Sequence, residues 1–179
     1  MATFLYSASL SLDGFLAGPG GDMSWLSEFM GPNPTVDELR PRIGALLIGN
    51  RTFGGDDPNR GTDAEGAYEG TWHGPQFVLT HRPPAEPVPD VTFVGDLDEA
   101  VRASADAAGD GYVSILGADV ARQCLSARVV DEVLMVVVPV LLGDGVRLFD
   151  LPGGAPMRLD PISVTEAPTG TNLWYRVRR

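Results

Sequence analysis

The chain has 179 residues, a formal net charge of -11 and a single cysteine, Cys124. The negative charge opposes binding to DNA, RNA or an anionic membrane, because each of these partners needs a basic face. One cysteine excludes an internal disulfide, and the length fits one domain, residues 1–179, that buries a full core. The N-terminus lacks the basic segment of a signal peptide, and no uncharged apolar run is long enough to cross a membrane. We therefore expect a cytoplasmic protein.

Apolar runs and helix-type patterns alternate along most of the chain. The predicted strands are Phe4–Leu10, Ala45–Gly49, Gln76–Thr80, Val91–Val94, Tyr112–Leu116 and Val133–Val138. The predicted helical segments are Ser24–Met30 with Asp22 or Ser24 as N-cap, Val36–Ile43, Leu97–Ala108 between Asp96 and Gly109, and Ala118–Ala127. The last stretch, from Met157 to Arg179, predicts two strands without a helix between them. The pattern predicts an α/β fold with a mostly parallel central sheet, flanking helices and a C-terminal antiparallel hairpin.

One stretch, Gly54–Pro75, has no hydrophobic period and is rich in Gly and Asp. Loops of this length inside a compact domain are usually either disordered or functional lids. Tyr68, Trp72 and His73 near its end favour a partly ordered lid over a plain linker.

Glycine, arginine and threonine residues follow three of the predicted strands. Gly117 lies between a strand and a helix, where free N–H groups and the helix dipole suit a phosphate. Gly49 precedes Asn50–Thr52 in the same way, and Thr80–Arg82 follows a third strand. Ligands of open α/β sheets bind beyond the carboxyl ends of the strands, so these turns together indicate an anionic ligand. Each turn taken alone could equally serve only the fold.

No constellation for hydrolysis or metal binding competes with this reading. His73 and His81 are the only histidines, and Cys124 lies in a helix that we expect to pack on the sheet. No pair of residues has the spacing of metal ligands, so we expect no metal site.

Five stretches, taken together and in this order, resemble the dihydrofolate reductase-like superfamily. The resemblance is closest to the branch shared with the C-terminal reductase domain of the bifunctional riboflavin-biosynthesis enzyme, here as a stand-alone bacterial member. The stretches are Ser11–Ala17, Leu46–Phe53, Phe77–Pro84, Val113–Leu125 and Val130–Phe149.

The resemblance implies NADPH bound across the strand ends. The implied cofactor residues are Ala8, Ala17 and Gly18 at the nicotinamide, Asn50, Arg51 and Thr52 at the phosphates, Thr80, His81 and Arg82 at the adenosine 2′-phosphate, and Leu116, Gly117, Ala118, Asp119 and Val120 around the pyrophosphate and ribose. Arg51 and Arg82 favour NADPH over NADH, because a guanidinium suits a phosphate. The sequence departs from the family pattern in two places. Gly117-Ala118 replaces the usual Gly-Gly and crowds the pyrophosphate slightly. Gly49-Asn50-Arg51 replaces the usual Gly-Arg pair and leaves open which side chain contacts a phosphate. A β-branched residue at Gly117 is expected to abolish binding and leave the fold largely intact, unless Gly117 serves only the turn.

Two carboxylates frame a glycine-rich turn near the N-terminus, and Trp25 is predicted to line the substrate side. Reducing a C=N bond needs a proton as well as a hydride, and a carboxylate in an apolar pocket can hold or relay that proton. Asp13 and Asp22 are therefore the candidate catalytic residues. Asp22 could equally be a helix N-cap, and Asp13 could be only a turn residue.

The resulting hypothesis is an NADPH-dependent reductase of a small planar heterocycle, either a pterin or dihydrofolate-like compound or a pyrimidine riboflavin precursor, as in a 5-amino-6-(5-phosphoribosylamino)uracil reductase. The alternatives are a non-catalytic nucleotide-binding or regulatory protein that keeps the cofactor cleft, and a trimethoprim-insensitive folate reductase. The apolar stretch Val133–Phe149 predicts a homodimer interface, unless all of it lies in the core of one monomer.

Overall fold

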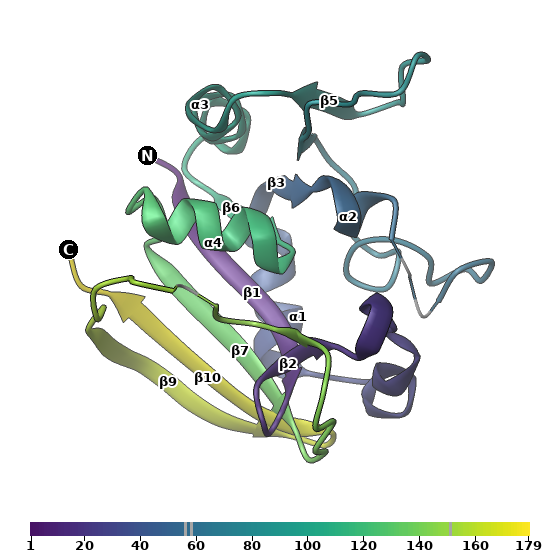
Figure 1. Cartoon of the computed structure of the whole chain (residues 1–179), viewed down its shortest axis with the longest axis vertical. Coiled ribbons are helices and arrows are strands. Elements are labelled where there is room, and N and C mark those ends of the chain that lie inside the picture. The colour runs from purple at the N-terminus through teal and green to yellow at the C-terminus, as the bar shows by residue number, and fades with distance from the viewer. Residues whose placement is uncertain (56, 58, 151) are drawn as a thin grey trace.

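A computed structural model of the chain describes residues 1–179 except 56, 58 and 151. The strands of the main sheet are β1 (Thr3–Ser11), β3 (Ile43–Gly49), β4 (Gln76–Leu79), β5 (Val91–Val94), β6 (Tyr112–Leu116), β7 (Glu132–Val138), β9 (Leu159–Ala167) and β10 (Gly170–Val177). In the described residues they form an 8-stranded sheet in the order β5-β4-β3-β6-β1-β7-β10-β9 (Figure 1). From β5 to β7 all neighbours are parallel, whereas β10 is antiparallel to both β7 and β9. The predicted mostly parallel sheet with a C-terminal antiparallel hairpin is confirmed.

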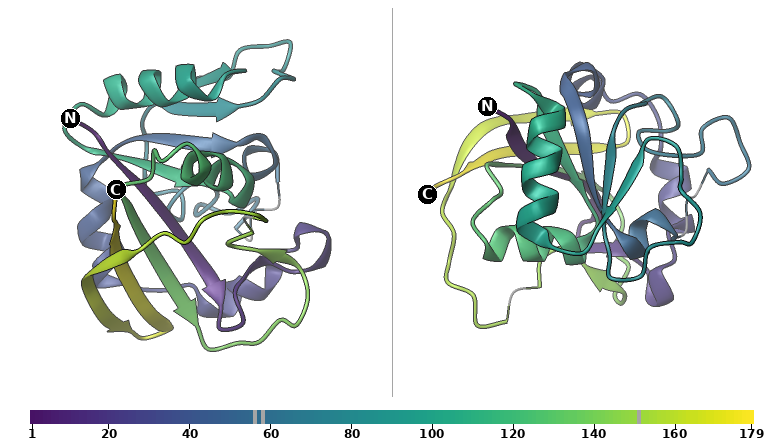
Figure 2. Two further views of the ribbon diagram at one scale, coloured as in Figure 1. Left: turned by 60° about the vertical axis from the view of Figure 1, so that its left-hand side comes forward. Right: turned by 90° about the horizontal axis from the view of Figure 1, so that it is seen from above.

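Helices cover both faces of the sheet. On one face, α3 (Leu97–Ala108) and α4 (Ala118–Ser126) pack against a core that includes Tyr6 and Met135. On the other face, Leu39 of α1 (Pro34–Leu39) and Trp72 pack against a second core that includes Leu5. We call these the α3/α4 face and the α1 face. In Figure 1, α4 lies in front of the sheet and α1 behind it, and the two further views in Figure 2 agree. From Val133 to Val138, strand β7 is apolar on both faces because both faces of the sheet are covered.

The boundaries follow the local signals closely where those signals are strong. Helix α3 spans the predicted residues, because the Asp96 carboxylate accepts the Glu99 N–H at 2.9 Å and Gly109 ends the helix with φ +61°. The predicted helix Val36–Ile43 is wrong in its second half. Pro41 has no N–H to continue the helix, so the chain passes through a 3₁₀ turn, η3 (Arg40–Arg42), and Ile43 already begins β3.

Smaller elements complete the fold. The predicted helical segment Ser24–Met30 is a 3₁₀ helix, η2 (Ser24–Phe29). A 3₁₀ turn, η1 (Pro19–Gly21), precedes it. Helix α2 (Asn50–Phe53) follows β3 directly. The sequence pattern missed a short antiparallel pair, β2 (Phe15–Ala17) with β8 (Val146–Arg147), because each strand is too brief to show a period. Within the part of the chain that the structure describes, no helix is long and apolar enough to cross a membrane.

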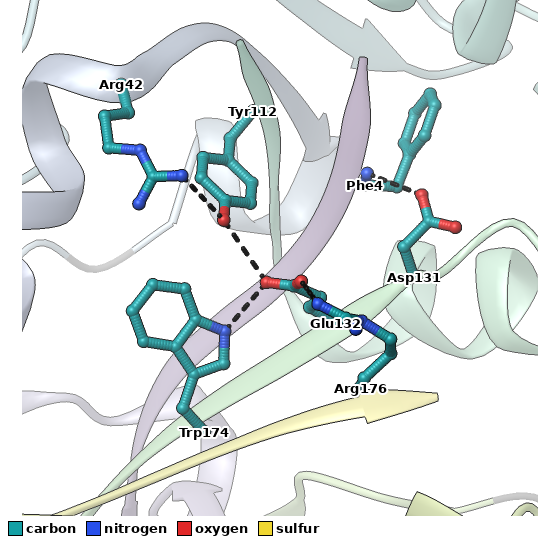
Figure 3. A network of polar contacts seen from close by, with 7 residues as sticks. All are labelled: Phe4, Arg42, Tyr112, Asp131, Glu132, Trp174 and Arg176. Atoms are coloured by element: carbon teal, nitrogen blue, oxygen red, sulfur yellow. Dashed lines mark hydrogen bonds and ion pairs between the residues drawn. The ribbon is translucent and has the colours of Figure 1, made fainter. Parts of the chain in front are cut away.

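A buried carboxylate organises the amino edge of the sheet, where the parallel strands begin (Figure 3). Glu132, only 6% exposed, accepts the indole N–H of Trp174 at 2.9 Å and the hydroxyl of Tyr112 at 3.3 Å. Arg176 donates to its other oxygen at 3.4 Å, and Arg42 donates to Tyr112 at 3.3 Å. We call these residues the Glu132 network. It ties β6, β7 and β10 together on the α1 face.

The C-terminal hairpin carries a β-bulge. Trp174 of β10 pairs with Ser163, and Tyr175 pairs with Pro161, so Ile162 of β9 has no partner in β10. An extra residue of this kind increases the local twist of the strand. Both chain termini lie at the amino edge of the sheet, away from α2 (Figures 1 and 2).

Candidate functional site

The carboxyl edge of the parallel strands gathers the predicted phosphate-binding residues. The strands β4, β3 and β6 are neighbours in the sheet, and the stretches Thr80–Arg82, Asn50–Thr52 and Gly117–Val120 follow them directly. Parallel strands place such turns side by side at one edge. The structure therefore brings these stretches into one row, with α2 and α4 each beginning there.

Gly117 and Gly49 bring the two strand-to-helix turns into close contact. A Cβ on Gly117 would overlap the Thr52 hydroxyl oxygen and would lie 3.2 Å from Thr52 Cβ and 3.9 Å from Gly49 N. A Cβ on Gly49 would lie 3.6 Å from Val120 Cγ1. The two glycines thus let the turns approach closely, with Thr52 and Val120 packed against them, and the first N–H groups of α4 have no acceptor within the helix. This arrangement fits the phosphates of a dinucleotide.

The geometry at Gly117 favours the alternative in which the glycine serves the turn, so that a β-branched residue there would cost stability. Gly117 has φ +106° and ψ 140°, a conformation that side chains with a Cβ rarely adopt, and Thr52 fills the position of the missing Cβ. The glycine is therefore required by the turn itself, whatever ligand binds there.

The charges at this edge are mixed. Arg51 and Arg82 are exposed, and no ion pair joins either of them to another described residue. Asp119, in the first turn of α4, has a lowered pKa, mainly because Arg122 donates a 2.7 Å hydrogen bond to it, and the charges of Arg122 and Arg51 add to that effect. The guanidinium groups of Arg51 and Arg82, which no described residue pairs, can therefore meet an anion, while Asp119 opposes one beside the helix N-terminus.

The remaining predicted cofactor residues in this row lie at the ends of β4 and β6 and at the start of α4. Leu116 is the last residue of β6 and packs against the α1-face core, and Ala118 begins α4. The Thr80 hydroxyl oxygen accepts the Arg82 N–H at 3.0 Å, which shapes the turn after β4. His81 is exposed, and its Nδ1 lies 3.5 Å from where a Cβ on Gly95 would stand.

Strands β1 and β6 part from one another before they reach the carboxyl edge. Their pairing runs from Thr3↔Tyr112 to Tyr6↔Ile115, but β1 continues to Ser11 and pairs only with β7 over that length. We call this divergence the fork. Beyond it, backbone groups of β1 that face β6 have no strand partner. Ala8 lies in this part of β1, on the α3/α4 face.

Asp13 is held as a structural carboxylate. Its oxygens accept the Ser11 hydroxyl at 2.6 Å, the Leu142 N–H at 3.1 Å and the Gly143 N–H at 2.7 Å. These hydrogen bonds, led by that of Ser11, lower the pKa of Asp13 to about 2. A group with this pKa holds no proton near neutral pH, so the geometry favours the alternative reading of Asp13 as a turn residue.

Asp22 is exposed and accepts hydrogen bonds that close the turns on either side of it. Its side chain accepts the Ser24 N–H at 2.9 Å, and this bond is the main cause of its lowered pKa. Its carbonyl accepts the Gly18 N–H at 2.8 Å, which closes the turn around η1. The N-cap of η2 is Met23, so the predicted N-cap at Asp22 or Ser24 is wrong, and Asp22 closes an Asx turn just before the helix.

The other predicted residues near the N-terminus surround the β1–β2 turn. Ala17, in β2, is buried against Gly145, and a Cβ on Gly145 would overlap the Ala17 carbonyl oxygen. Trp25 is half-buried and packs on Phe29 with ring centroids 6.4 Å apart. The Trp25 indole N–H is buried, and no described residue accepts it.

Two surface hollows lie away from this edge. One, of about 420 Å³, is lined by residues at the amino edge that include Arg42, Asp110 and Tyr112. The other, of about 520 Å³, lies near His73 and Asp90. Both are open and neither includes a predicted cofactor residue, so we place the candidate site by backbone geometry rather than by volume. In the described residues, no group of three His, Cys, Asp or Glu side chains is close enough to hold a metal ion.

Sequence reasoning missed one polar group at the fork. Tyr68 comes from the loop between α2 and β4, and its hydroxyl lies 2.7 Å from that of Ser114 in β6. The aromatic residues of the loop hinted at partial order, and Trp72 is indeed buried, with its indole N–H donating to the Ile43 carbonyl at 3.1 Å. No local pattern indicates which strand such a loop residue reaches.

The predicted dimer interface needs correction. Val133, Leu134, Met135, Val136 and Val138 of β7 are all less than 9% exposed, because β1 and β10 flank the strand and both faces of the sheet are covered. This part of Val133–Phe149 therefore belongs to the monomer core. The segment beyond it still exposes large apolar side chains, namely Leu141, Val146 and Phe149.

Comparisons with known proteins agree with this architecture. The chain matches the model of the RibD C-terminal domain over residues 2–173. It is 27% identical over 149 residues to the uncharacterized protein YwjB of Bacillus subtilis (strain 168), which covers 82% of each chain. The crystal structure of a putative riboflavin biosynthesis protein from Shewanella sp. PV-4 superposes with a TM-score of 0.75 at 25% identity, covering 100% of both chains.

The fold also matches dihydrofolate reductase. The enzyme from Enterococcus faecalis, solved in complex with NADP(H), superposes with a TM-score of 0.64 at 14% identity, covering 99% of this chain and 97% of that one. The chain therefore has the fold of dihydrofolate reductase. It belongs to the RibD C-terminal domain family.

Proposed function

We propose that the protein is a reductase that uses NADPH to transfer a hydride to a small planar heterocycle. The observation that carries this proposal is the close approach of the turns at Gly49 and Gly117, where the first N–H groups of α4 lie in the same turn region as Thr52. The fork between β1 and β6 adds a place for a flat ring next to that cradle. Bound NADPH would supply the hydride, and the chain would supply binding, orientation and electrostatics.

The phosphates of the cofactor would be held by two sets of groups. Backbone N–H groups at Ala118–Val120 and the Thr52 hydroxyl suit the pyrophosphate, and Arg51 and Arg82 suit the remaining phosphate charge. A guanidinium forms strong charge-assisted hydrogen bonds with a phosphate and only weak ones with a free ribose hydroxyl. Arg51 and Arg82 therefore favour NADPH over NADH.

For the substrate we propose a pterin or dihydrofolate-like compound, or a pyrimidine precursor of riboflavin. The riboflavin option is supported by family membership and by the likeness to the putative riboflavin biosynthesis protein of Shewanella sp. PV-4. The fold likeness to dihydrofolate reductase supports the pterin option. Both are planar and carry ring nitrogens beside a reducible bond.

A second candidate is a nucleotide-binding or regulatory protein that keeps the cleft without turnover. It is favoured by the lowered pKa values of Asp13 and Asp22, which leave neither carboxyl group protonated near neutral pH. Mixing the protein with NADPH and then with dihydrofolate, a uracil precursor or a flavin separates the two. NADPH binding without oxidation by any acceptor would favour the second candidate.

The decisive experiment for the cofactor is isothermal titration of NADPH and NADH on wild type, Arg82→Ala and a control, Arg102→Ala, on the exposed side of α3. Loss of a charge-assisted contact should weaken NADPH by about 1.5–3 kcal/mol in Arg82→Ala and leave NADH and the control unchanged. Equal affinity of the wild type for both cofactors would remove the 2′-phosphate site.

We also propose a homodimer, formed through the exposed apolar remainder of the predicted segment. Leu141, Val146 and Phe149 stay uncovered in the monomer, and apolar surface of this kind tends to become an interface. Light scattering at micromolar concentration tests this, and a monomeric mass would refute it.

A further inference from the structure

The loop between α2 and β4 places a tyrosine hydroxyl where β1 and β6 separate. Tyr68 Oη lies 2.7 Å from Ser114 Oγ in β6. The side chain of Ser7 in β1 interacts with the same hydroxyl and lowers its pKa. Ser7 follows Tyr6, the last residue of β1 that pairs with β6. Tyr68 packs against the α1-face core. Its hydroxyl therefore marks the apex of the fork on that face.

The backbone of this loop adopts unfavourable conformations to hold Tyr68 there. Tyr68 and Glu69 have φ of +54° and +57°, a left-handed conformation that residues other than glycine rarely adopt. Gly70 follows with φ +67°, and a Cβ there would lie 2.9 Å from the carbonyl oxygens of Asp63 and Glu65. Residues in such conformations persist only when their surroundings hold them, and they cluster at functional sites.

Two anchors beside the turn supply that restraint. The buried indole of Trp72 donates to the Ile43 carbonyl at 3.1 Å. Arg40 donates to the Thr71 hydroxyl at 2.6 Å, and that hydroxyl donates to the Tyr68 carbonyl. The loop is thus fixed to the start of β3 and to η3 on one side, which leaves the Tyr68 ring directed at the fork.

The three hydroxyl groups have more hydrogen-bonding capacity than they use among themselves. Tyr68, Ser7 and Ser114 bring one O–H each, and their mutual bonds use at most two of the three. No other described residue hydrogen-bonds their hydroxyl oxygens. Burial raises the pKa of Tyr68, while the bonds to Ser114 and Ser7 partly oppose this, so its hydroxyl keeps its hydrogen at neutral pH. At least one of the three O–H groups therefore has no acceptor among the other two.

We propose that Tyr68, with Ser7 and Ser114, forms the substrate-recognition group of the site and hydrogen-bonds a ring carbonyl or ring nitrogen of a planar heterocycle lying against the α1 face of the fork. This proposal rests on the proposed function. The carbon of the reduced C=N bond takes the nicotinamide hydride, and its nitrogen takes a proton from water. Tyr68 keeps its own hydrogen, because its part is to orient and polarise the ring. Leu116, in the same core cluster, would cover part of the ring.

The test compares Tyr68→Phe with a matched control, Tyr175→Phe, whose half-buried ring lies in β10 on the α3/α4 face. A second variant, Ser114→Ala, removes the partner hydroxyl and leaves the loop tyrosine in place. Each protein is checked by circular dichroism and thermal unfolding. NADPH affinity is then measured by fluorescence, followed by binding of lumazine, dihydrofolate and a 5-amino-6-(ribosylamino)uracil probe to the NADP⁺-loaded protein, and by KM and kcat for any probe that is reduced.

We expect Tyr68→Phe and Ser114→Ala to bind NADPH as the wild type does and to bind the heterocycle about tenfold more weakly. KM for the heterocycle should rise while KM for NADPH stays constant, which a merely structural role would not produce. Unchanged heterocycle binding in Tyr68→Phe would overturn the proposal, as would a wild type that binds NADPH but none of the probes. A wild type that binds no NADPH would refute the proposed function itself, and the recognition role with it.

Discussion

The two edges of the central sheet differ in how their polar groups are satisfied. At the amino edge, the Glu132 network uses the carboxylate fully, since Trp174, Tyr112 and Arg176 all donate to it (Figure 3). At the carboxyl edge, glycines replace side chains, Arg51 and Arg82 stand without ion pairs among the described residues, and β1 leaves β6. The polar groups of the amino edge are hydrogen-bonded to one another, whereas those of the carboxyl edge remain able to bind a ligand. We therefore expect the amino edge to contribute mainly to stability and the carboxyl edge mainly to binding.

The largest expected effect is at the amino edge. Glu132→Ala leaves two buried donors, Trp174 Nε1 and Tyr112 Oη, without their acceptor, and should lower the free energy of unfolding by about 3 kcal/mol. Urea denaturation measures this, with Glu166→Ala on the exposed side of β9 as the control. The NADPH affinity of the folded variant should equal that of the wild type. A weaker affinity would show that the two edges are coupled.

The second prediction concerns the glycine between β6 and α4. Gly117→Ala combines a strained φ of +106° with overlap of the Thr52 hydroxyl, so both stability and NADPH affinity should fall, stability by about 1–3 kcal/mol. Gly109→Ala is the matched control, because Gly109 has φ +61° but nothing within 4 Å of a Cβ. It should lose stability only and bind NADPH normally. Wild-type affinity in folded Gly117→Ala would refute the cofactor cradle.

The third prediction separates stability from binding in the first turn of α4. Asp119→Asn removes a carboxylate that suits the helix N-terminus and pairs with Arg122, so the protein should lose about 0.5 kcal/mol of stability. The same change removes a negative charge beside the proposed pyrophosphate, so NADPH should bind a few-fold more tightly. Thermal unfolding and titration on one sample check both. Asp106→Asn, an exposed change on α3, should alter neither.

The smallest expected effect is the pH dependence contributed by Asp13. Its pKa is about 2 in the folded protein against an ordinary value of 3.8, so its carboxylate stabilises the fold fully above that ordinary value. The contribution is lost as the pH falls through the interval between the two values. Asp13→Asn should therefore lower Tm at neutral pH and flatten the fall of Tm in that acid interval. A steeper fall in the variant, or an unchanged Tm at neutral pH, would contradict the structural role.

Local signals were enough for most of the fold. Continuous apolar runs marked β3, β6 and β7, and the Asp96 and Gly109 pair marked both ends of α3. Helix α4 is one residue shorter than predicted, because Ala127 already leaves the helical conformation. The row of turns at the carboxyl edge could also be inferred, since parallel strands alone dictate that their ends meet.

The contacts that decide roles in the site could not be read from local patterns. Asp13 is bound by the N–H of Leu142, 129 residues away in the chain, and Tyr68 reaches Ser114 across 46 residues. The fork depends on where the pairing of β1 with β6 ends while its pairing with β7 continues, and the sequence of a single strand does not indicate this. The hydrogen bonds of Asp13 to residues distant in the chain, rather than its residue type, distinguish a structural carboxylate from a candidate proton donor.

The bulge in the C-terminal hairpin bears on how the protein avoids aggregation. β9 is the outermost strand of the sheet and exposes Leu159, Ile162 and Val164, a composition that invites another chain to add as a further strand. Pro161 has no N–H, and the unpaired Ile162 interrupts the spacing of the donors beside it. An incoming strand would therefore meet a twisted edge with a broken row of hydrogen-bond donors. The hairpin can keep apolar side chains at its rim without becoming a template for fibril growth.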